Sequence, residues 1–391
     1  MKIHSFTATC LSTLMVMSIV VVCNMYASAV MAGQTSAAYF SETYQEARLK
    51  FLAAAKSAGG VIEHHLNPRT GAAGEALYTD VVTFGLPGAD SALVVGSGTH
   101  GVEGFAGSAI QVGLLQQGIA SELPDNVGLL FYHALNPYGF SHLRRFNEDN
   151  VDLNRNFVDR YEAQSNRDYE QMAWIFEPQS LLFWENIKAK VGLAWYRVNK
   201  GARWLQSAIS RGQYSHPAGV FYGGANETRS NLILRDIVRR HLSRVSRVVL
   251  VDVHTGLGEY ASAEVITEID PGTPSYEWMS QCWETPVTNP RAGDAVSPPI
   301  TGSLKQAFAN MLSHAEVMGG SLEFGTYPPL EVLWALRAEN HVHHHGGMKH
   351  PEAEAIKKEL RRVFYPTEAE WRNAAWDQGS RLVRATLDCL R

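Results

Sequence analysis

A histidine and a glutamate three positions apart, His100 and Glu103, lie in the segment 97–104 (SGTHGVEG). The segment follows the apolar run 92–95. Residues at positions i and i+3 of a helical turn share one face, so the imidazole and the carboxylate can approach the same ion. An open zinc site needs about three protein ligands, and two histidines with one glutamate form a known set. The spacing therefore predicts part of a metal site.

A third ligand and a base are expected at His254 and Glu323. His254 follows the apolar run 248–253, which only Asp252 interrupts, and Glu323 lies in the segment 321–325 (SLEFG). Sites of open α/β sheets lie at the carboxyl ends of the strands, where these polar residues are expected. Asp252 shares a strand side with His254, and we expect it to orient an imidazole, most simply that of His100.

Two arginines, Arg145 and Arg155, lie in the polar segment 145–157 (RFNEDNVDLNRNF). Guanidinium groups bind carboxylates through paired hydrogen bonds and stabilise an oxyanion in a dry site. Solvated or structural arginines are the alternative. Each motif also occurs by chance without a function, so the prediction depends on all four motifs together and on their order.

The four motifs together resemble the zinc carboxypeptidase (M14) superfamily, which includes the succinylglutamate desuccinylase and aspartoacylase branch. The nearest likeness is the DUF2817 group of M14-like proteins, over roughly residues 39–391. Segments 252–256 (DVHTG) and 322–325 (LEFG) resemble the desuccinylase branch, whereas 151–157 (VDLNRNF) resembles the carboxypeptidases. Asn150 stands where many relatives have glycine.

The resemblance implies that His100, Glu103 and His254 bind one zinc ion. Glu323 would then act as general base and acid, and Arg145 would polarise the scissile carbonyl. The implied reaction is hydrolysis of an amide bond in a peptide or N-acyl amino acid that carries a carboxylate. The alternatives are a zinc-dependent deacylase or esterase, and a non-catalytic binding protein on the same fold.

Substrate binding is implied for a second group of residues. Asn154 and Arg155 would hold a substrate carboxylate, and Arg144 competes with Arg145 for the carbonyl. A tyrosine closes over the substrate in the carboxypeptidases, and the candidates here are Tyr222 and Tyr327.

Apolar runs typical of strands alternate with segments of helical periodicity, which predicts an α/β fold. Strands are expected at 61–65, 76–84, 92–96, 127–133, 248–253 and 319–324, and helices at 39–58 and 105–117. The resemblance implies three layers, with a mixed, mostly parallel, twisted sheet between helices. We expect one domain over residues 33–391, with a helical, aromatic-rich insertion at about 159–246.

The composition limits the partners. The 391 residues are 45% hydrophobic with a net charge of −5, and no basic stripe indicates a nucleic-acid partner. The histidine run 341–345 is expected to be a solvated surface tract rather than a second metal site. The oligomeric state is not predicted.

The first 32 residues have the pattern of a signal peptide. Lys2 precedes the apolar run 11–23, and small residues near positions 29 and 32 are suited to cleavage. We therefore expect an exported protein, periplasmic or secreted, without a membrane span after cleavage; an uncleaved anchor is the alternative. Cys10 and Cys23 would leave with the signal, while Cys282 and Cys389 are expected either to form a disulfide or to remain buried thiols.

Overall fold

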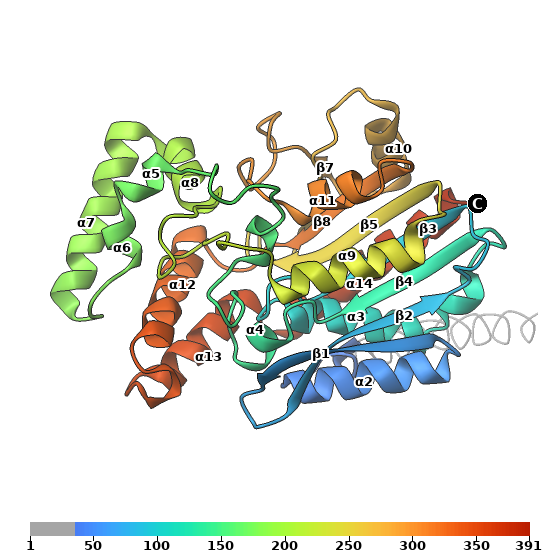
Figure 1. Ribbon diagram of the computed structural model, residues 1–391, viewed down its shortest axis with the longest axis horizontal. Helices are drawn as coiled ribbons and strands as arrows, with labels where there is room; N and C mark the ends of the chain where they lie inside the picture. The colour runs from blue at the N-terminus through green and yellow to red at the C-terminus, as the bar shows by residue number, and fades with distance from the viewer. Residues whose placement is uncertain (1–35) are drawn as a thin grey trace, which may run out of the picture.

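The computed structural model describes residues 36–391, and within them a sheet of eight strands forms the centre (Figure 1). The strand order is β1-β2-β4-β3-β5-β8-β6-β7. The central strands β4, β3, β5 and β8 are parallel, whereas β1, β2 and β6 run antiparallel to their neighbours towards the centre. The strands are β1 (Val61–Thr70), β2 (Ala76–Phe84), β3 (Ser91–Gly96), β4 (Val127–His133), β5 (Arg247–Thr255), β6 (Ala263–Ile266), β7 (Val287–Thr288) and β8 (Glu316–Phe324). The predicted mixed, mostly parallel sheet is confirmed.

Helices cover both faces of this sheet, as the α/β prediction requires. Leu93 and Val95 of β3 lie in a core with α2 (Tyr44–Ser57), α3 (Gly104–Gln116), α10 (Pro274–Cys282) and α14 (Ala369–Cys389). Val94 points to the other face, into a core with α9 (Arg229–Leu242) and α11 (Leu304–Met311). Because both faces are covered, every residue of β3 and β4 is buried, which explains their unbroken apolar runs.

A third core lies beyond the carboxyl ends of the central strands. It joins α5 (Arg167–Glu170), α6 (Ala173–Phe176), α7 (Phe183–Lys200) and α8 (Ala202–Ser210) to α12 (Pro329–His344) and α13 (Ala353–Phe364). These helices form the left end of the molecule in Figure 1. Since α9 belongs to the layer on the sheet, the projecting part of the segment 159–246 is shorter than expected. Short helices complete the chain: α4 (Pro137–Ser141), η1 (Ile119–Glu122), η2 (Leu153–Arg155) and η3 (Gly347–Lys349).

The expected signal peptide, residues 1–32, lies outside the described residues, as do Cys10 and Cys23. Among residues 36–391, no helix combines the length and apolar character needed to cross a bilayer.

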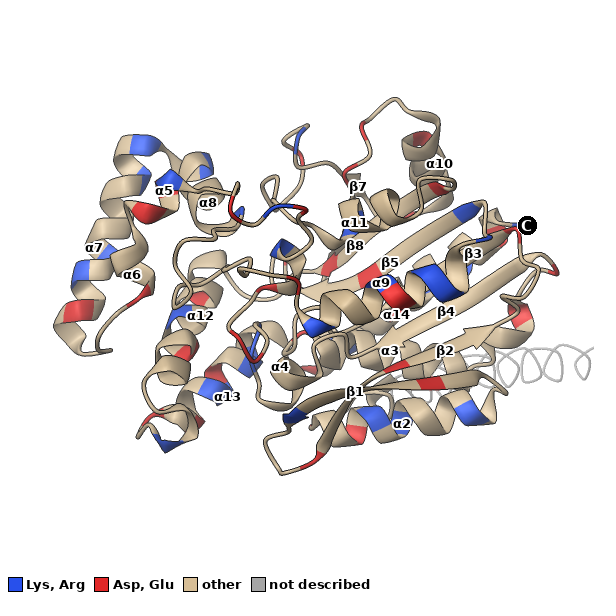
Figure 2. Cartoon of the chain, in the orientation of Figure 1, with Lys and Arg blue, Asp and Glu red and all other residues tan. Residues whose placement is uncertain are grey.

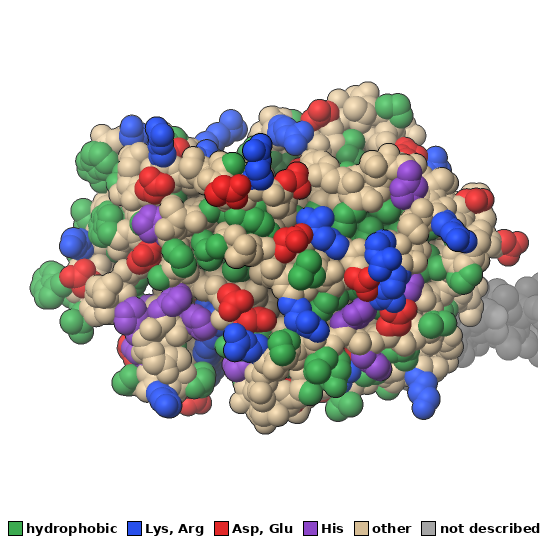
Figure 3. Space-filling model, viewed as in Figure 1, with side chains coloured by type: hydrophobic (Ala, Val, Ile, Leu, Met, Phe, Trp, Pro, Cys, Tyr) green, Lys and Arg blue, Asp and Glu red, His purple; other side chains and the backbone are tan. Residues whose placement is uncertain are grey.

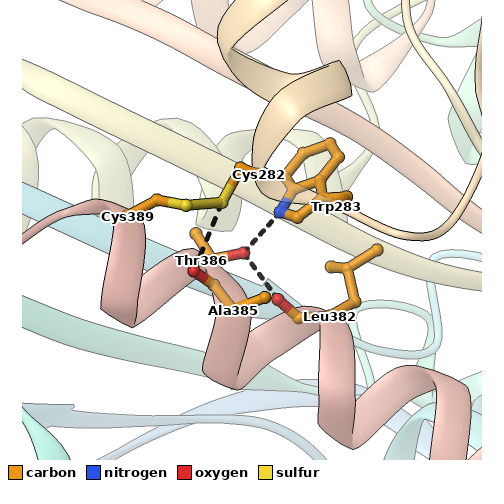
Figure 4. The surroundings of a disulfide bond; sticks show 6 residues. All are labelled: Cys282, Trp283, Leu382, Ala385, Thr386 and Cys389. Carbon is orange, nitrogen blue, oxygen red and sulfur yellow. Dashed lines mark hydrogen bonds between the residues drawn. A yellow bond between two sulfur atoms is a disulfide. The ribbon is translucent and has the colours of Figure 1, made fainter.

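Cys282 and Cys389 form a disulfide, which confirms one of the two alternatives for this pair. The bridge joins the end of α10 to the end of α14 (Figure 4). Next to it, Trp283 Nε1 donates to Thr386 Oγ1 at 2.9 Å, so a hydrogen bond supports the same helix contact. The two cysteines are 107 residues apart in the sequence, so the bridge closes a long loop of the unfolded chain.

Replacing both cysteines, Cys282→Ser with Cys389→Ser, should lower the free energy of unfolding by about 2–4 kcal/mol, because the unfolded chain regains the entropy of the open loop. Denaturant unfolding followed by circular dichroism measures this change. The unaltered protein under reducing conditions is the control and should lose the same amount. Equal stability of the oxidised protein and the double variant would contradict the prediction.

Candidate metal centre

Three side chains at the carboxyl ends of β3 and β5 converge on one point: His100, Glu103 and His254. All are buried, and their donor atoms are neighbours. The two Nδ1 atoms are 3.1 Å apart, His254 Nδ1 is 3.1 Å from Glu103 Oε2, and His100 Nδ1 is 3.0 Å from Glu103 Oε1. Bonds of about 2.0–2.2 Å to a tetrahedral ion place donor atoms roughly 3.3–3.6 Å apart. The donor set therefore fits one metal ion after small adjustments.

No other group of three such donors lies close enough to hold an ion within residues 36–391. The histidine run 341–345 matches the expected surface tract only in part. His344 and His345 are exposed at the end of α12, as expected for a surface tract, whereas His341 is buried and approaches Pro178 O at 2.8 Å through Nδ1.

The turn after β3 holds its two ligands by packing closely against α4. A Cβ atom on Gly101 would lie 2.0 Å from the carbonyl carbon of Gly139, so only glycine fits there. The backbone N–H of Gly101 donates to Arg145 O at 3.1 Å, and that of Val102 donates to Arg144 O at 2.7 Å. These bonds join the ligand turn to the arginine-containing segment.

A buried carboxylate orients each imidazole from behind. His254 Nε2 is 2.6 Å from Asp252 Oδ2, and His100 Nε2 is 3.1 Å from Asp152 Oδ1. The contacts leave each Nδ1 to face the common centre, an arrangement that fixes metal-binding histidines. The expectation that Asp252 orients His100 is wrong. Asp252 and His254 are two residues apart on β5, so their side chains lie on the same side of the strand. The carboxylate of Asp252 therefore contacts the imidazole of His254 and not that of His100.

Asp152 was missed as a partner of the site, although it lies inside the motif 151–157. Its carboxylate is fully buried, accepts from Arg145 Nε at 3.1 Å and receives the backbone N–H of Asn154 at 3.0 Å. Burial alone would raise the pKa of Asp152, but the charges of Arg145 and Arg155 hold it well below its usual range. Asp152 therefore stays ionised and joins a ligand histidine to an arginine.

The charges around the donor atoms favour a cation at their centre. Burial alone would raise the pKa of Glu103, yet His100 and Arg145 keep it well below its usual range. Burial alone would lower the pKa of His254, yet Asp252 and Glu103 raise it to about 10. The carboxylates around His254 therefore favour positive charge at this point, and a metal ion can also supply it.

Glu323 lies on β8 directly beside His254 of β5 in the strand register. Its Oε1 accepts the backbone N–H of Leu257 at 3.0 Å. Burial and the nearby charge of Glu103 raise the pKa of Glu323 to about 7. A carboxyl group that titrates near neutral pH can both take up and release a proton, as a general base and acid must.

A cavity of about 630 Å³ opens over these groups. Six of the predicted residues line it, namely His100, Arg145, Asn154, Arg155, His254 and Glu323. Its outer walls come from α7, α8 and α12 and are mainly apolar, with Leu193, Leu205, Ile209, Val332, Trp334 and Leu336 among them. Sequence reasoning missed Lys305, which also lines the cavity, because a single lysine on a helix carries no distinguishing pattern.

The two arginines of the cavity have different partners. Arg145 donates to the ligand Glu103 at 2.7 Å as well as to Asp152, so it lies against the metal centre. Arg155 donates from Nε and NH2 to Ser210 O and from NH1 to Asn154 O. Three of its five N–H donors are thus used, and one remains on each terminal nitrogen. Both guanidinium groups lie over the ring of Phe221, at 5.4 and 5.7 Å.

Asn154 completes the anion-binding part of this cavity. Its Oδ1 accepts from Leu304 N at 2.9 Å, which fixes the amide group. Among residues 36–391, no acceptor lies within hydrogen-bond distance of its Nδ2, so that donor is available at the cavity wall.

Arg144 is turned away from the cavity, which corrects its expected role at the substrate carbonyl. It is buried and donates to Glu339 at 2.8 Å and to Asn150 at 2.7 Å. Asn150 has a left-handed φ of 60°, a conformation that asparagine adopts more readily than most residues other than glycine. Arg144 therefore stabilises the loop, and its guanidinium group lies outside the cavity.

The two candidate tyrosines are also outside the cavity lining. Tyr222 is buried and uses its backbone carbonyl to accept from Asp152 N at 2.7 Å. The ring of Tyr327 lies beneath Arg362, 4.2 Å from its guanidinium carbon. Phe221, the neighbour of Tyr222, lines the cavity instead, and its φ of 57° is left-handed.

Comparisons with known proteins gave matches to solved structures and to one protein family. A search of curated proteins gave no match to this chain. Among solved structures, a metallo-carboxypeptidase from Pseudomonas aeruginosa in complex with (2-guanidinoethylmercapto)succinic acid is similar at 13% identity, with 90% of this chain and 71% of that chain covered and a TM-score of 0.45. Carboxypeptidase A from Helicoverpa armigera is similar at 14% identity, with 84% and 75% covered and a TM-score of 0.40.

The succinylglutamate desuccinylase from Chromobacterium violaceum is similar at 16% identity, with 81% of this chain and 74% of that chain covered and a TM-score of 0.36. The model of a family described as protein of unknown function, DUF2817, matches residues 40–378. Since this match spans most of the 391 residues, the chain belongs to the DUF2817 family.

Proposed function

We propose that the protein is a zinc-dependent hydrolase that cleaves an amide bond in a peptide or N-acyl amino acid bearing a carboxylate. The observation that carries this proposal is the presence of three elements in one cavity. A metal-binding donor set, a carboxyl group with a pKa near 7 and two arginines line the same space. Two imidazoles and one carboxylate are donors that suit zinc.

Each residue has a chemical task in this reaction. Zinc held by His100, Glu103 and His254 supplies Lewis acidity towards water and a carbonyl oxygen. Glu323 takes a proton from the attacking water and gives it to the leaving amine. Arg145 donates to the negative charge that develops on the carbonyl oxygen, a contact typically worth about 2.7–4 kcal/mol.

Asn154 and Arg155 are assigned the substrate carboxylate. The free N–H groups on the two terminal nitrogens of Arg155 match the paired geometry in which a guanidinium binds a carboxylate. Lys305 adds a positive charge to the same cavity. These donors orient the substrate so that its amide lies over Glu323 and the metal.

A second candidate is a zinc-dependent deacylase or esterase, and the apolar outer walls of the cavity favour it. Side chains of α7, α8 and α12 offer an acyl chain a dry surface. A panel of peptides, N-acyl amino acids and aryl esters separates the two candidates. The pattern of residues 1–32 supports export as part of either proposal.

Purified protein should contain about one zinc ion per chain, measured by elemental analysis. Asp252→Asn and Asp152→Asn should each weaken metal affinity by about 10–100-fold, because the histidines lose the acceptors that orient them. Competition with a chromophoric chelator measures the affinity. Asp236→Asn, an exposed aspartate on α9, is the control and should bind zinc as the parent does. Unchanged affinity in both site variants would contradict the proposed centre.

Glu323→Gln should retain zinc and lower kcat by about 10²–10⁴-fold, because amide oxygen is a poor proton acceptor. Glu264→Gln is the matched control, since this glutamate pairs with Glu323 across β6 and β8 but does not line the cavity. Full activity of Glu323→Gln would rule out the base.

The pH profile gives an independent check of the same base. Glu323 must be ionised to accept a proton, so kcat/KM should fall about tenfold per pH unit below its pKa. The metal-free pKa is about 7, and a bound cation lowers it, so the acid limb should lie at or below that pH. If the residual activity of Glu323→Gln shows the same acid limb, the titration belongs to a group other than Glu323.

Arg155→Gln should raise KM for substrates with a carboxylate by roughly 10–150-fold, the range for a hydrogen bond to a charged group. Comparing each substrate with its amidated analogue measures the effect directly, because the variant should no longer distinguish them. Arg145→Gln should lower kcat for both the carboxylate substrate and its amidated analogue. If Arg155→Gln still prefers the free carboxylate as the parent does, the assigned role of Arg155 is wrong.

A further inference from the structure

Helix α7 has two apolar stripes on opposite sides. Ala189 and Leu193 are buried against the third core. At 100° per residue, a second stripe lies on the opposite side, and it consists of Trp184, Ile187, Val191, Trp195 and Val198. The exposed fractions of Trp184, Val191 and Val198 are 75%, 63% and 83%.

Further exposed apolar side chains lie near this stripe in the sequence and the fold. Leu182, Phe183 and Trp174 are exposed next to it and extend the patch. Contiguous apolar patches on soluble proteins mark interaction sites. In Figure 3, hydrophobic side chains are exposed along the left end of the molecule, where α7 lies in Figure 1.

Basic side chains border the stripe. Lys188 lies on one flank, and Lys190 and Arg197 lie on the other. Residues 183–211 contain six lysines and arginines and one acidic residue, Glu185, whereas the whole chain has a net charge of −5. Figure 2 shows these basic residues along α7 and α8. The partner of this face is therefore expected to be anionic as well as apolar.

We propose that α7 docks this face on an anionic lipid bilayer. Tryptophan and phenylalanine side chains favour the headgroup region, and amphipathic helices with lysine and arginine beside such a face lie in the interface plane. A second copy of the chain fits less well. A twofold contact through α7, which has four lysines and arginines and one glutamate, would place two sets of three net positive charges together.

The position of α7 links this surface to the cavity. Lys190, Leu193 and Arg197 line the cavity from the inner side of the same helix that exposes Trp184 and Trp195. Docking would therefore hold the cavity about one helix diameter, roughly 10 Å, from the bilayer surface. The proposal does not depend on the zinc chemistry, and its test needs no turnover.

The test is co-sedimentation of the full chain with vesicles of phosphatidylcholine alone or mixed with phosphatidylglycerol. We expect binding to the anionic vesicles, weaker at high salt because screening reduces charge attraction. Trp184→Glu with Trp195→Glu should weaken binding by more than about tenfold. Leu49→Glu, at a residue 68% exposed on α2, is the matched control and should bind as the parent does.

Neutralising the flanking charge tests the second part of the surface. Lys188→Gln, which spares the cavity-lining Lys190 and Arg197, should weaken binding to anionic vesicles by roughly fivefold and leave binding to neutral vesicles unchanged. The apolar segment 11–23 is common to all variants, so the comparison among them isolates α7.

Quenching by brominated lipid gives a readout specific to α7. Trp184→Phe with Trp195→Phe should bind like the parent but lose most of the quenching, because the indoles removed are those in the bilayer. The proposal is overturned if the parent does not bind, or if the glutamate double variant binds as well as the parent. It is also overturned if quenching is unchanged in the phenylalanine double variant. Concentration-dependent dimers that the glutamate variant abolishes, without vesicle binding, would assign the face to a second copy.

Discussion

Asp152 is fully buried, and its carboxylate stays charged only because cations surround it. Arg145 donates to it, His100 faces it, and Arg155 lies within 3.9 Å. The same Arg145 reaches the ligand Glu103, and its backbone carbonyl accepts from the ligand turn at Gly101. One buried charge therefore fixes a metal-binding imidazole and the arginine proposed to stabilise the oxyanion. Removing it would leave several buried charges without partners.

Much of this arrangement could be predicted from the sequence because it depends on local patterns. Apolar runs identify β3, β4 and β5, since both faces of these strands are covered, although Asp252 interrupts the run in β5. Polar residues directly after such runs identify His100 and His254, because the core ends where the strands end. The strands β6 and β7 could not be found in this way, since they are four and two residues long and carry no measurable periodicity.

The partners of the site were less predictable because long-range packing determines them. Asp152 and Asp252 are both acidic residues near the motifs, and only the folded chain shows which imidazole each one meets. Arg144 and Arg145 are adjacent, yet one faces Glu339 in the interior and the other faces the cavity. Phe221 lines the cavity whereas the adjacent Tyr222 does not, a difference that the residue types do not reveal.

His254 and Glu323 are opposite each other on adjacent parallel strands, so the distance between ligand and base follows from the backbone hydrogen bonds of the sheet. The walls of the cavity come from other elements, the helices α7, α8 and α12. The donor residues and the cavity walls therefore belong to separable parts of the chain. Under the proposed function, changes in those helices can alter which substrate fits while the spacing between His254 and Glu323 stays constant.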